Sequence, residues 1–242
     1  MSVLKPASSL VAPPEALAAQ LDIRFDDLSL LAMALRHRSA GHRNNERLEF
    51  LGDAILNLVI SDRLYELRPE APEGELSRWR ASLVREESLA KIARSLNLGN
   101  YLVLGSGELK SGGFRRDSIL ADALEAMIGA VYLDQGFAVA KAVLDRLFDP
   151  LLARLPDAAS LKDPKTRLQE WLQGARRELP SYEVTGTWGQ AHQQVFEVTC
   201  RLSDQATISV GRGSSRRKAE QAAAEQMLAR LTDAPVPVGD EV

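Results

Sequence analysis

The sequence predicts an all-α domain followed by a small α+β domain of the order α-β-β-β-α. Two observations support this fold class. Apolar residues recur at helical spacing from residue 15 to 156, with few alternating β-branched runs. Residues 163–232 combine two helical segments with three segments that alternate with period two, as half-buried strands do. Residues 157–162 are polar and are expected to form a linker.

The helices of the first domain are expected wherever apolar residues recur at intervals of three and four. Such spacing gives each helix one face to bury against its neighbours. The segments that follow this rule are 28–39, 45–67, 76–96, 118–136 and 138–155.

The second domain is expected to begin with a helix over 166–177 and to end with a helix over 214–231. A three-stranded sheet of this size needs both helices on one face to cover it. Residues 1–14 and the tail 233–242 are rich in Pro, lack any period and are expected to be disordered. The strands are expected over 181–188, 194–203 and 206–213.

The composition predicts a globular protein of a reducing compartment. A hydrophobic content of 45% over 242 residues is enough to build ordinary cores. The single cysteine, Cys200, cannot form an internal disulfide and is expected to be a buried strand residue rather than a nucleophile. The N-terminus has no uninterrupted signal-peptide core, and no run of about 18 apolar residues occurs. We therefore expect a cytoplasmic protein with no membrane partner.

Two groups of carboxylates carry the candidate chemistry. Glu46, Glu49 and Asp53 lie at i, i+3 and i+7, which places them within one arc of roughly 60° on the first long helix. Apolar residues cover most of the remaining circumference, so this helix is expected to be substantially buried. Asp122 and Glu125 are the only charges in an otherwise apolar helical stretch, and no Lys or Arg lies one turn away.

Oxygen ligands without His or Cys favour Mg²⁺ or Mn²⁺ over Zn²⁺. Buried ion pairs are the alternative explanation, because Glu46 and Glu49 could pair with nearby or distant arginines. Periodicity alone leaves this choice open. The candidate partners are Arg43, Arg47, Arg115 and Arg116.

The chain resembles a known family. The stretch NERLEFLGDAIL is similar to the signature of ribonuclease III, and GELKSGGFRRDSILADALEAMIGAVYLD is similar to the second acidic block of that family. DPKTRLQEWLQG and GSSRRKAEQAAAEQML resemble its double-stranded-RNA-binding domain. The resemblance covers nearly the whole chain. It implies an all-α endonuclease domain followed by a small α+β double-stranded-RNA-binding domain.

The resemblance also implies roles for the acids. Glu49, Asp122 and Glu125 would hold catalytic Mg²⁺, with Mn²⁺ able to substitute, and Asp53 would be essential beside them. Glu46 and Glu73 would line the same acidic valley. Metal ions would polarise the scissile phosphate of double-stranded RNA and acidify an attacking water. The products would carry 5′-phosphate and 3′-hydroxyl ends with short 3′ overhangs, and the substrates would include ribosomal RNA precursors, some messengers and other structured RNAs.

The start of the last helix indicates a phosphate partner. Arg216, Arg217 and Lys218 place three cations at the positive end of the helix dipole, where an anion would stabilise them. A solvated basic turn balanced by Glu220 is the alternative, and the net charge of −3 adds no support for RNA. The resemblance favours phosphate contacts across the major groove. It also assigns minor-groove contacts to four residues of the opening helix, Thr166, Gln169, Glu170 and Gln173, and to His192 in the first strand–strand loop.

Two other features have weaker interpretations. His37 and His42 have no nucleophile beside them that would make a catalytic triad. The stretch GSGELKSGG lacks the Lys-Ser/Thr ending of a phosphate-binding P-loop. We interpret it as a loop shaping the first domain, with Lys110, Arg115 and Arg116 near RNA.

Cutting both strands of a duplex in one encounter needs two sites related by symmetry, which a homodimer provides. The resemblance implies such a dimer with Phe50 packing into the partner, although Phe50 could equally be a core residue. Two other functions stay open from the sequence: a non-catalytic RNA-binding protein that keeps the helical domain for dimerisation, and an all-α metal-dependent phosphohydrolase acting on nucleotides.

Overall fold

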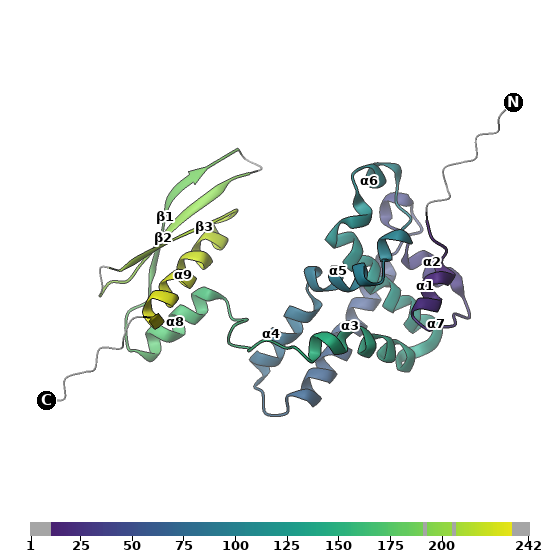
Figure 1. The fold of residues 1–242 in the computed structure, drawn as a ribbon, viewed down its shortest axis with the longest axis horizontal. Coiled ribbons are helices and arrows are strands. Elements are labelled where there is room, and N and C mark those ends of the chain that lie inside the picture. Colours follow the sequence, from purple (N-terminus) through teal and green to yellow (C-terminus); the bar gives the residue numbers. More distant parts are fainter. Residues whose placement is uncertain (1–10, 191–192, 205–206, 234–242) are drawn as a thin grey trace. The chain divides into compact units, whose positions relative to one another are not determined.

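The structure is a computed structural model that describes residues 11–190, 193–204 and 207–233. The chain divides into two compact units, residues 1–157 and 158–242, which are described separately here. Figure 1 shows a helical unit and a unit with a small sheet. This arrangement confirms the predicted fold class of an all-α domain followed by an α-β-β-β-α domain.

The first unit consists of helices joined by short loops. Several helices begin where local chemistry favours a start: the Asp27 carboxylate accepts the Ser29 N–H at 2.9 Å, and Glu73 lies in the first turn after Pro72. The α-helices are α1 (Pro14–Gln20), α2 (Leu28–Ala34), α3 (Glu46–Leu67), α4 (Glu73–Val84), α5 (Glu86–Ser95), α6 (Ser106–Lys110) and α7 (Asp117–Leu152). Short 3₁₀ turns are η1 (Arg38–Ala40), η2 (Leu98–Asn100) and η3 (Gly113–Arg115).

Helices α3 and α7 cross in direct backbone contact. A Cβ atom added to Gly52 of α3 would lie 1.8 Å from the Glu125 carbonyl oxygen, and one added to Gly129 of α7 would lie 2.3 Å from the Leu48 carbonyl oxygen. Any side chain at either position would force the two backbones apart. Each helix therefore uses a glycine to bring its acidic turn against the other.

Helix α7 is the central element of the first unit. Its buried residues run from Ile119 to Leu152, and Gly136, with φ of 80°, breaks the helix in two. This break lies where the sequence separates the expected helices 118–136 and 138–155. By length and composition alone α7 could cross a membrane, and it is the one described helix for which this is true. Its apolar side chains pack inside the domain, as those of a core helix do.

The second unit consists of α8 (Pro164–Gly174), β1 (Ser181–Trp188), β2 (Val195–Arg201), β3 (Ile208–Gly213) and α9 (Arg216–Asp233). The strands form an antiparallel sheet in the order β1-β2-β3. Val184 pairs with Val198, and Cys200 pairs with Ser209. In Figure 1, α8 and α9 lie together against this sheet.

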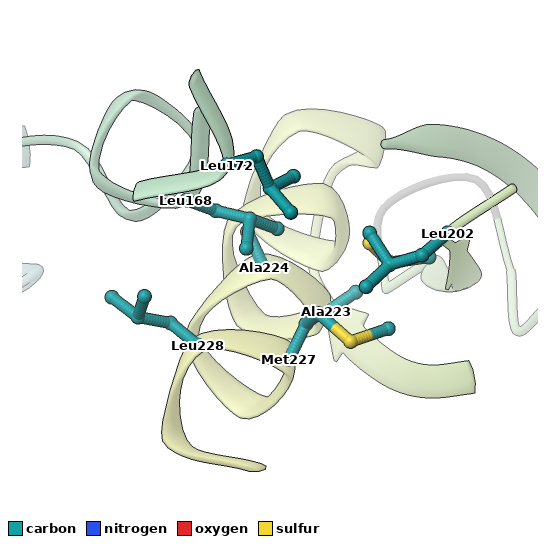
Figure 2. Close-up of a cluster of buried hydrophobic side chains, with 8 residues drawn as sticks. Leu168, Leu172, Leu202, Ala223, Ala224, Met227 and Leu228 are labelled. Atoms are coloured by element: carbon teal, nitrogen blue, oxygen red, sulfur yellow. The ribbon is translucent and has the colours of Figure 1, made fainter. Parts of the chain in front are cut away.

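The core of the second unit lies between the helices and the sheet. Figure 2 shows Leu168 and Leu172 of α8 facing α9, whose Met227 is also buried. Cys200 contributes from β2 and is fully buried, as expected. Leu168 and Leu172, one turn apart on α8, thus supply the core, and the opposite face of this helix stays exposed.

The ends of the chain are more ordered than expected where they are described. The Ala12 N–H donates to the Asn100 carbonyl at 2.8 Å, and Pro14 begins α1, so these residues of the extension that was expected to be disordered are ordered. Proline is well suited to a first helical position because its missing N–H needs no partner there. Residues 1–10 and 234–242 lie outside the described residues, as does His192.

We predict that Gly52→Ala and Gly129→Ala each lower the free energy of unfolding by about 1–3 kcal/mol, because the added methyl group meets backbone rather than a movable side chain. Urea unfolding of the metal-free protein measures this. Gly107→Ala is the matched control: an added Cβ there meets nothing within 4 Å, so its effect stays within about 0.5 kcal/mol. Equal effects of all three substitutions would contradict the helix contact.

Candidate active site and RNA interface

Three carboxylates meet at the crossing of α3 and α7. One oxygen from each of Glu49, Asp122 and Glu125 lies within 4.8 Å of the others. All three side chains are partly buried. Among the described residues none of the three forms a salt bridge, so the ion pairs that the sequence left open are absent for Glu49. The group combines three negative charges without a direct cationic partner.

This crowding changes the acidity of the group. The pKa of Glu125 is raised to about 8, first by burial and then by the neighbouring carboxylates, Asp53 foremost. Burial also raises the pKa of Glu49 and of Asp122. A divalent cation would remove this penalty, and an oxygen-only donor set of this kind suits hard ions such as Mg²⁺.

Two further acids of α3 lie beside this group. The Asp53 carboxylate is exposed and accepts the Asn57 side-chain N–H at 2.7 Å. Glu46 is also exposed; it accepts from the Asn44 amide at 2.9 Å and lies 3.8 Å from the Arg38 guanidinium. Neither is part of the close carboxylate group, but the charge of each acts on a member of it.

Glu73 lies elsewhere in the described chain. Its carboxylate accepts the Ser77 hydroxyl at 2.6 Å and lines a separate hollow of about 400 Å³ with Asp62, Tyr65 and Arg80. That hollow faces the C-terminal half of α3, whereas Glu49 belongs to the N-terminal half. Within one chain, Glu73 therefore does not join the carboxylate group of Glu49, Asp122 and Glu125.

An apolar strip runs along the outside of α3. Phe50 is 81% exposed, Tyr65 74% and Leu58 58%. Phe50 is therefore not a core residue, and α3 is less buried than its composition suggested. Phe50 borders a hollow of about 1020 Å³, whose apolar lining includes Leu30, Met33, Leu48, Leu51 and Leu133.

Helix α8 has an exposed polar face opposite its buried leucines. The Asp163 carboxylate accepts the Lys165 N–H at 2.9 Å and so begins the helix. The exposed side chains lie at i, i+3, i+4 and i+7, which is one face of a helix. They are Thr166, Gln169, Glu170 and Gln173.

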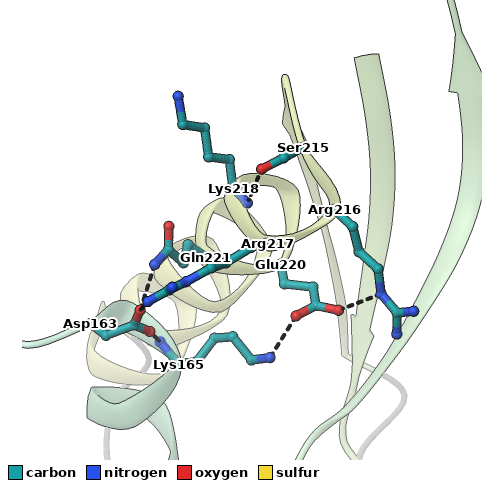
Figure 3. A network of polar contacts seen from close by, with 8 residues as sticks. All are labelled: Asp163, Lys165, Ser215, Arg216, Arg217, Lys218, Glu220 and Gln221. Atoms are coloured by element: carbon teal, nitrogen blue, oxygen red, sulfur yellow. Dashed lines mark hydrogen bonds and ion pairs between the residues drawn. The ribbon is translucent and has the colours of Figure 1, made fainter. Parts of the chain in front are cut away.

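The three cations at the start of α9 have different surroundings, as Figure 3 shows. Arg216 donates to Glu220 at 2.9 Å, and the same carboxylate accepts from Lys165 of α8 at 2.6 Å. Arg217 lies 3.8 Å from Asp163 and is 82% exposed. The Lys218 ammonium has no partner among the described residues and points away from the network. Glu220 thus balances Arg216 and leaves the other two cations largely free.

Family models match both units. Residues 27–151 match a model described as Ribonuclease-III-like, and residues 164–231 match one described as double-stranded RNA binding motif. The chain belongs to the ribonuclease III family. Ribonuclease III enzymes are endoribonucleases, so the chain is an RNA hydrolase.

Individual ribonucleases III agree with this assignment. The Ribonuclease 3 of Alkalilimnicola ehrlichii is 58% identical over 91% of this chain and 97% of its own length. That of Dechloromonas aromatica is 54% identical over 90% and 98%. Among solved structures, a nuclease domain of ribonuclease III from Campylobacter jejuni is 48% identical, with a TM-score of 0.55, and covers 56% of this chain and 96% of that domain. Its description concerns flexibility in a region involved in dimer formation.

Sequence reasoning missed the surroundings of this ribonuclease III site. A hollow beside Asp122 is also lined by the adjacent residues His37 and Arg38 and by Arg116, which come from two separate segments. The sequence signal was only the pair His37-Arg38 shortly before the signature helix. Nothing in residue spacing indicates that the start of α7 closes over that pair.

Stability should depend on pH through Glu125. Because its pKa is about 8 in the folded chain and ordinarily 4.5, unfolding releases a proton between these values, and stability falls as pH rises through that range. Glu125→Gln stays neutral. We expect the metal-free variant to match the wild type near about pH 4.5 and to exceed it near about pH 8.5 by on the order of 2 kcal/mol, reduced by partial solvent screening.

Urea unfolding without metal at both pH values measures the difference. Glu87→Gln is the control, because the Glu87 side chain is 65% exposed, pairs with Arg85 and is not among the charges that shift the pKa values of the three carboxylates. The account is contradicted if the advantage of Glu125→Gln over the wild type is the same at both pH values.

Proposed function

We propose that this chain hydrolyses phosphodiester bonds in double-stranded RNA with Mg²⁺, or Mn²⁺ in its place, held by Glu49, Asp122 and Glu125. The observation that carries the proposal is the close carboxylate group without a cationic partner. When bound, the ion supplies Lewis-acid chemistry at the phosphate. Asp53, whose charge acts on Glu125, is assigned a catalytic role beside the ligands, and Glu46 a supporting one.

Membership of the ribonuclease III family leads us to expect products with 5′-phosphate and 3′-hydroxyl ends, and two offset cuts would leave short 3′ overhangs. We assign the enzyme to the cytoplasm, where the free thiol of Cys200 stays reduced. Substrates recognised by duplex shape would include structured regions of ribosomal RNA precursors, messengers and other RNAs.

The second unit is proposed to hold the duplex. The exposed face of α8 offers Thr166, Gln169, Glu170 and Gln173 to a minor groove, as a helix reading A-form RNA would. At the start of α9, Arg217 and Lys218 are the principal phosphate contacts because they are the least neutralised cations there. Arg216 supports them through Glu220. His192 is assigned a contact with a further minor groove.

We propose a homodimer formed through the exposed strip of α3. A twofold axis would seat Phe50 of each copy in the partner's apolar hollow, which buries a side chain otherwise 81% exposed. Antiparallel packing of the two α3 helices would bring the C-terminal half of one toward the N-terminal half of the other. Glu73 would then join the acidic valley of the partner rather than that of its own chain. The Campylobacter description of dimer formation supports this arrangement.

Two other functions make different demands. A non-catalytic RNA-binding protein has no need for three crowded carboxylates, whose burial raises their pKa values. A nucleotide phosphohydrolase has no need for the second unit. Neither has an observation in its favour.

Cleavage of duplex RNA separates the three functions. We predict that the wild type cuts duplex RNA only with Mg²⁺, that chelation stops cutting, and that single-stranded RNA and nucleoside triphosphates stay intact. Glu125→Gln should lower the rate by about 10³-fold or more, because it removes one anionic ligand. Glu87→Gln should cut normally. Full cutting by Glu125→Gln would refute the assigned site.

Salt dependence of duplex binding without metal tests the cations. The slope of log affinity against log salt should become shallower by roughly 0.9 in Arg217→Ala and in Lys218→Ala, since each substitution removes one phosphate contact. Arg216→Ala should change the slope less, because Arg216 already donates to Glu220, a carboxylate that it shares with Lys165. Equal changes for all three variants would show that Arg216 is a phosphate contact like the others.

The dimer has a direct test in mass measurement by light scattering. We expect the wild type to be dimeric and Phe50→Asp to be monomeric, because the substitution replaces the aromatic contact with the apolar wall of the hollow by a charge that would lose its hydration there. Leu109→Asp is the control, since Leu109 is 53% exposed on α6, away from the strip. A monomeric wild type at micromolar concentration would argue against this interface.

A further inference from the structure

A hollow of about 490 Å³ adjoins the proposed metal site, and apart from Asp122 and Glu46 its lining residues have no role in the function proposed above. Asp122 belongs to both the hollow and the carboxylate group. The remaining wall comes from η1, the start of α3, α6 and the first turns of α7. Its lining residues are His37, Arg38, Ser39, Glu46, Glu108, Arg116, Ser118 and Ile119.

The His37 ring has a fixed hydrogen-bonding pattern in this wall. Its Nδ1 accepts the Ser39 N–H at 3.2 Å and lies 2.8 Å from the Ser39 hydroxyl oxygen. That oxygen accepts the Gly105 N–H at 2.9 Å, so the hydroxyl hydrogen is directed to Nδ1. With two donors on Nδ1, the neutral ring carries its hydrogen on Nε2. Among the described residues Nε2–H has no acceptor.

The backbone around Ser39 holds this pattern in place. A Cβ atom added to Gly105 would lie 2.2 Å from the Ser39 carbonyl oxygen, so the two segments approach as closely as they do only because position 105 is glycine. The His37 N–H also donates to Val103 at 3.1 Å. The His37 donor is therefore preorganised by contacts that make no use of Nε2.

Other donors face the same space. The first turn of α7 includes Ser118 and Ile119, whose amide N–H groups lack carbonyl partners at a helix start, and no side chain caps this helix. Arg38 is 70% exposed and makes a long contact with Glu46, at 3.8 Å. Arg116, by contrast, pairs closely with Glu108, at 2.9 Å. The lining of the hollow carries the carboxylates of Glu46, Glu108 and Asp122 and the guanidinium groups of Arg38 and Arg116, so its charges nearly balance. An ion on the neighbouring carboxylates would make the hollow favourable to an anion.

We propose that this hollow receives the RNA backbone phosphate next to the cleaved bond, with His37 donating its Nε2–H to a non-bridging oxygen and so positioning the strand. The inference rests on the proposed function, since the neighbouring ion supplies the positive potential. His37 is a positioning residue that touches a phosphate other than the reacting one. Arg38 adds a mobile cation at the mouth of the hollow.

Steady-state cleavage of a short duplex with Mg²⁺ tests the role of His37. His37→Leu, which has no donor, should lower kcat by about 10²-fold, as loss of one preorganised donor does, with KM changed less than about threefold. His37→Gln keeps an N–H near the Nε2 position and should recover at least about tenfold of that loss. Unfolding midpoints of both variants, and their duplex affinity without metal, should match the wild type.

Sulfur substitution identifies the phosphate. A single phosphorothioate placed at each phosphate flanking the cleaved bond in turn should slow the wild type at one position and have no further effect there in His37→Leu. Equal sulfur effects in both proteins, or an unchanged kcat in His37→Leu, would overturn this inference while leaving the proposed function intact. Failure of the wild type to cut the unmodified duplex would overturn both.

Discussion

The contact of two helix backbones at Gly52 and Gly129 is the constraint on which the rest of the structure depends. Glu49 lies one turn before Gly52, and Glu125 lies one turn before Gly129, so the crossing brings the two acidic turns together. No side chain fits between the helices at that point. The carboxylate group, its raised pKa values and its need for a cation all follow from this approach, because separating the helices would let each acid be solvated alone.

Helix α3 carries both the carboxylates and the exposed apolar strip, on faces set by the helical period. Successive residues are about 100° apart, so Glu49 faces α7 while Phe50 faces outward with the exposed apolar strip. The proposed metal site and the proposed dimer surface are thereby coupled through one rigid element. In the second unit, Glu220 plays a comparable organising part: it joins Lys165 of α8 to Arg216 of α9 and so fixes the two helices that are proposed to contact RNA.

Much of the fold and of the carboxylate group was predictable from residue spacing. The rest could not be predicted, for identifiable physical reasons. The α-β-β-β-α order followed from periods of two and of 3.6 residues. The acids of α3 stood out because they share one face, and those of α7 because no Lys or Arg lies one turn away. Spacing assigns a face of a helix but not the residues that this face meets. The family resemblance grouped Glu73 with acids that it does not meet within one chain. Periodicity also cannot separate a core residue from an exposed apolar residue such as Phe50. The pairing of Lys165 with Glu220 and the hollow around His37 depend on segments far apart in sequence.

Calorimetric titration of the protein with Mg²⁺ at pH 7, in two buffers of different ionisation enthalpy, tests the central claim most directly. Because the pKa of Glu125 is about 8 without metal, this carboxyl is largely protonated at pH 7 and must lose its proton when an ion binds. We predict release of about one proton per bound ion in the wild type, and loss of that release in Glu125→Gln. Binding heats that are identical in the two buffers would contradict the account.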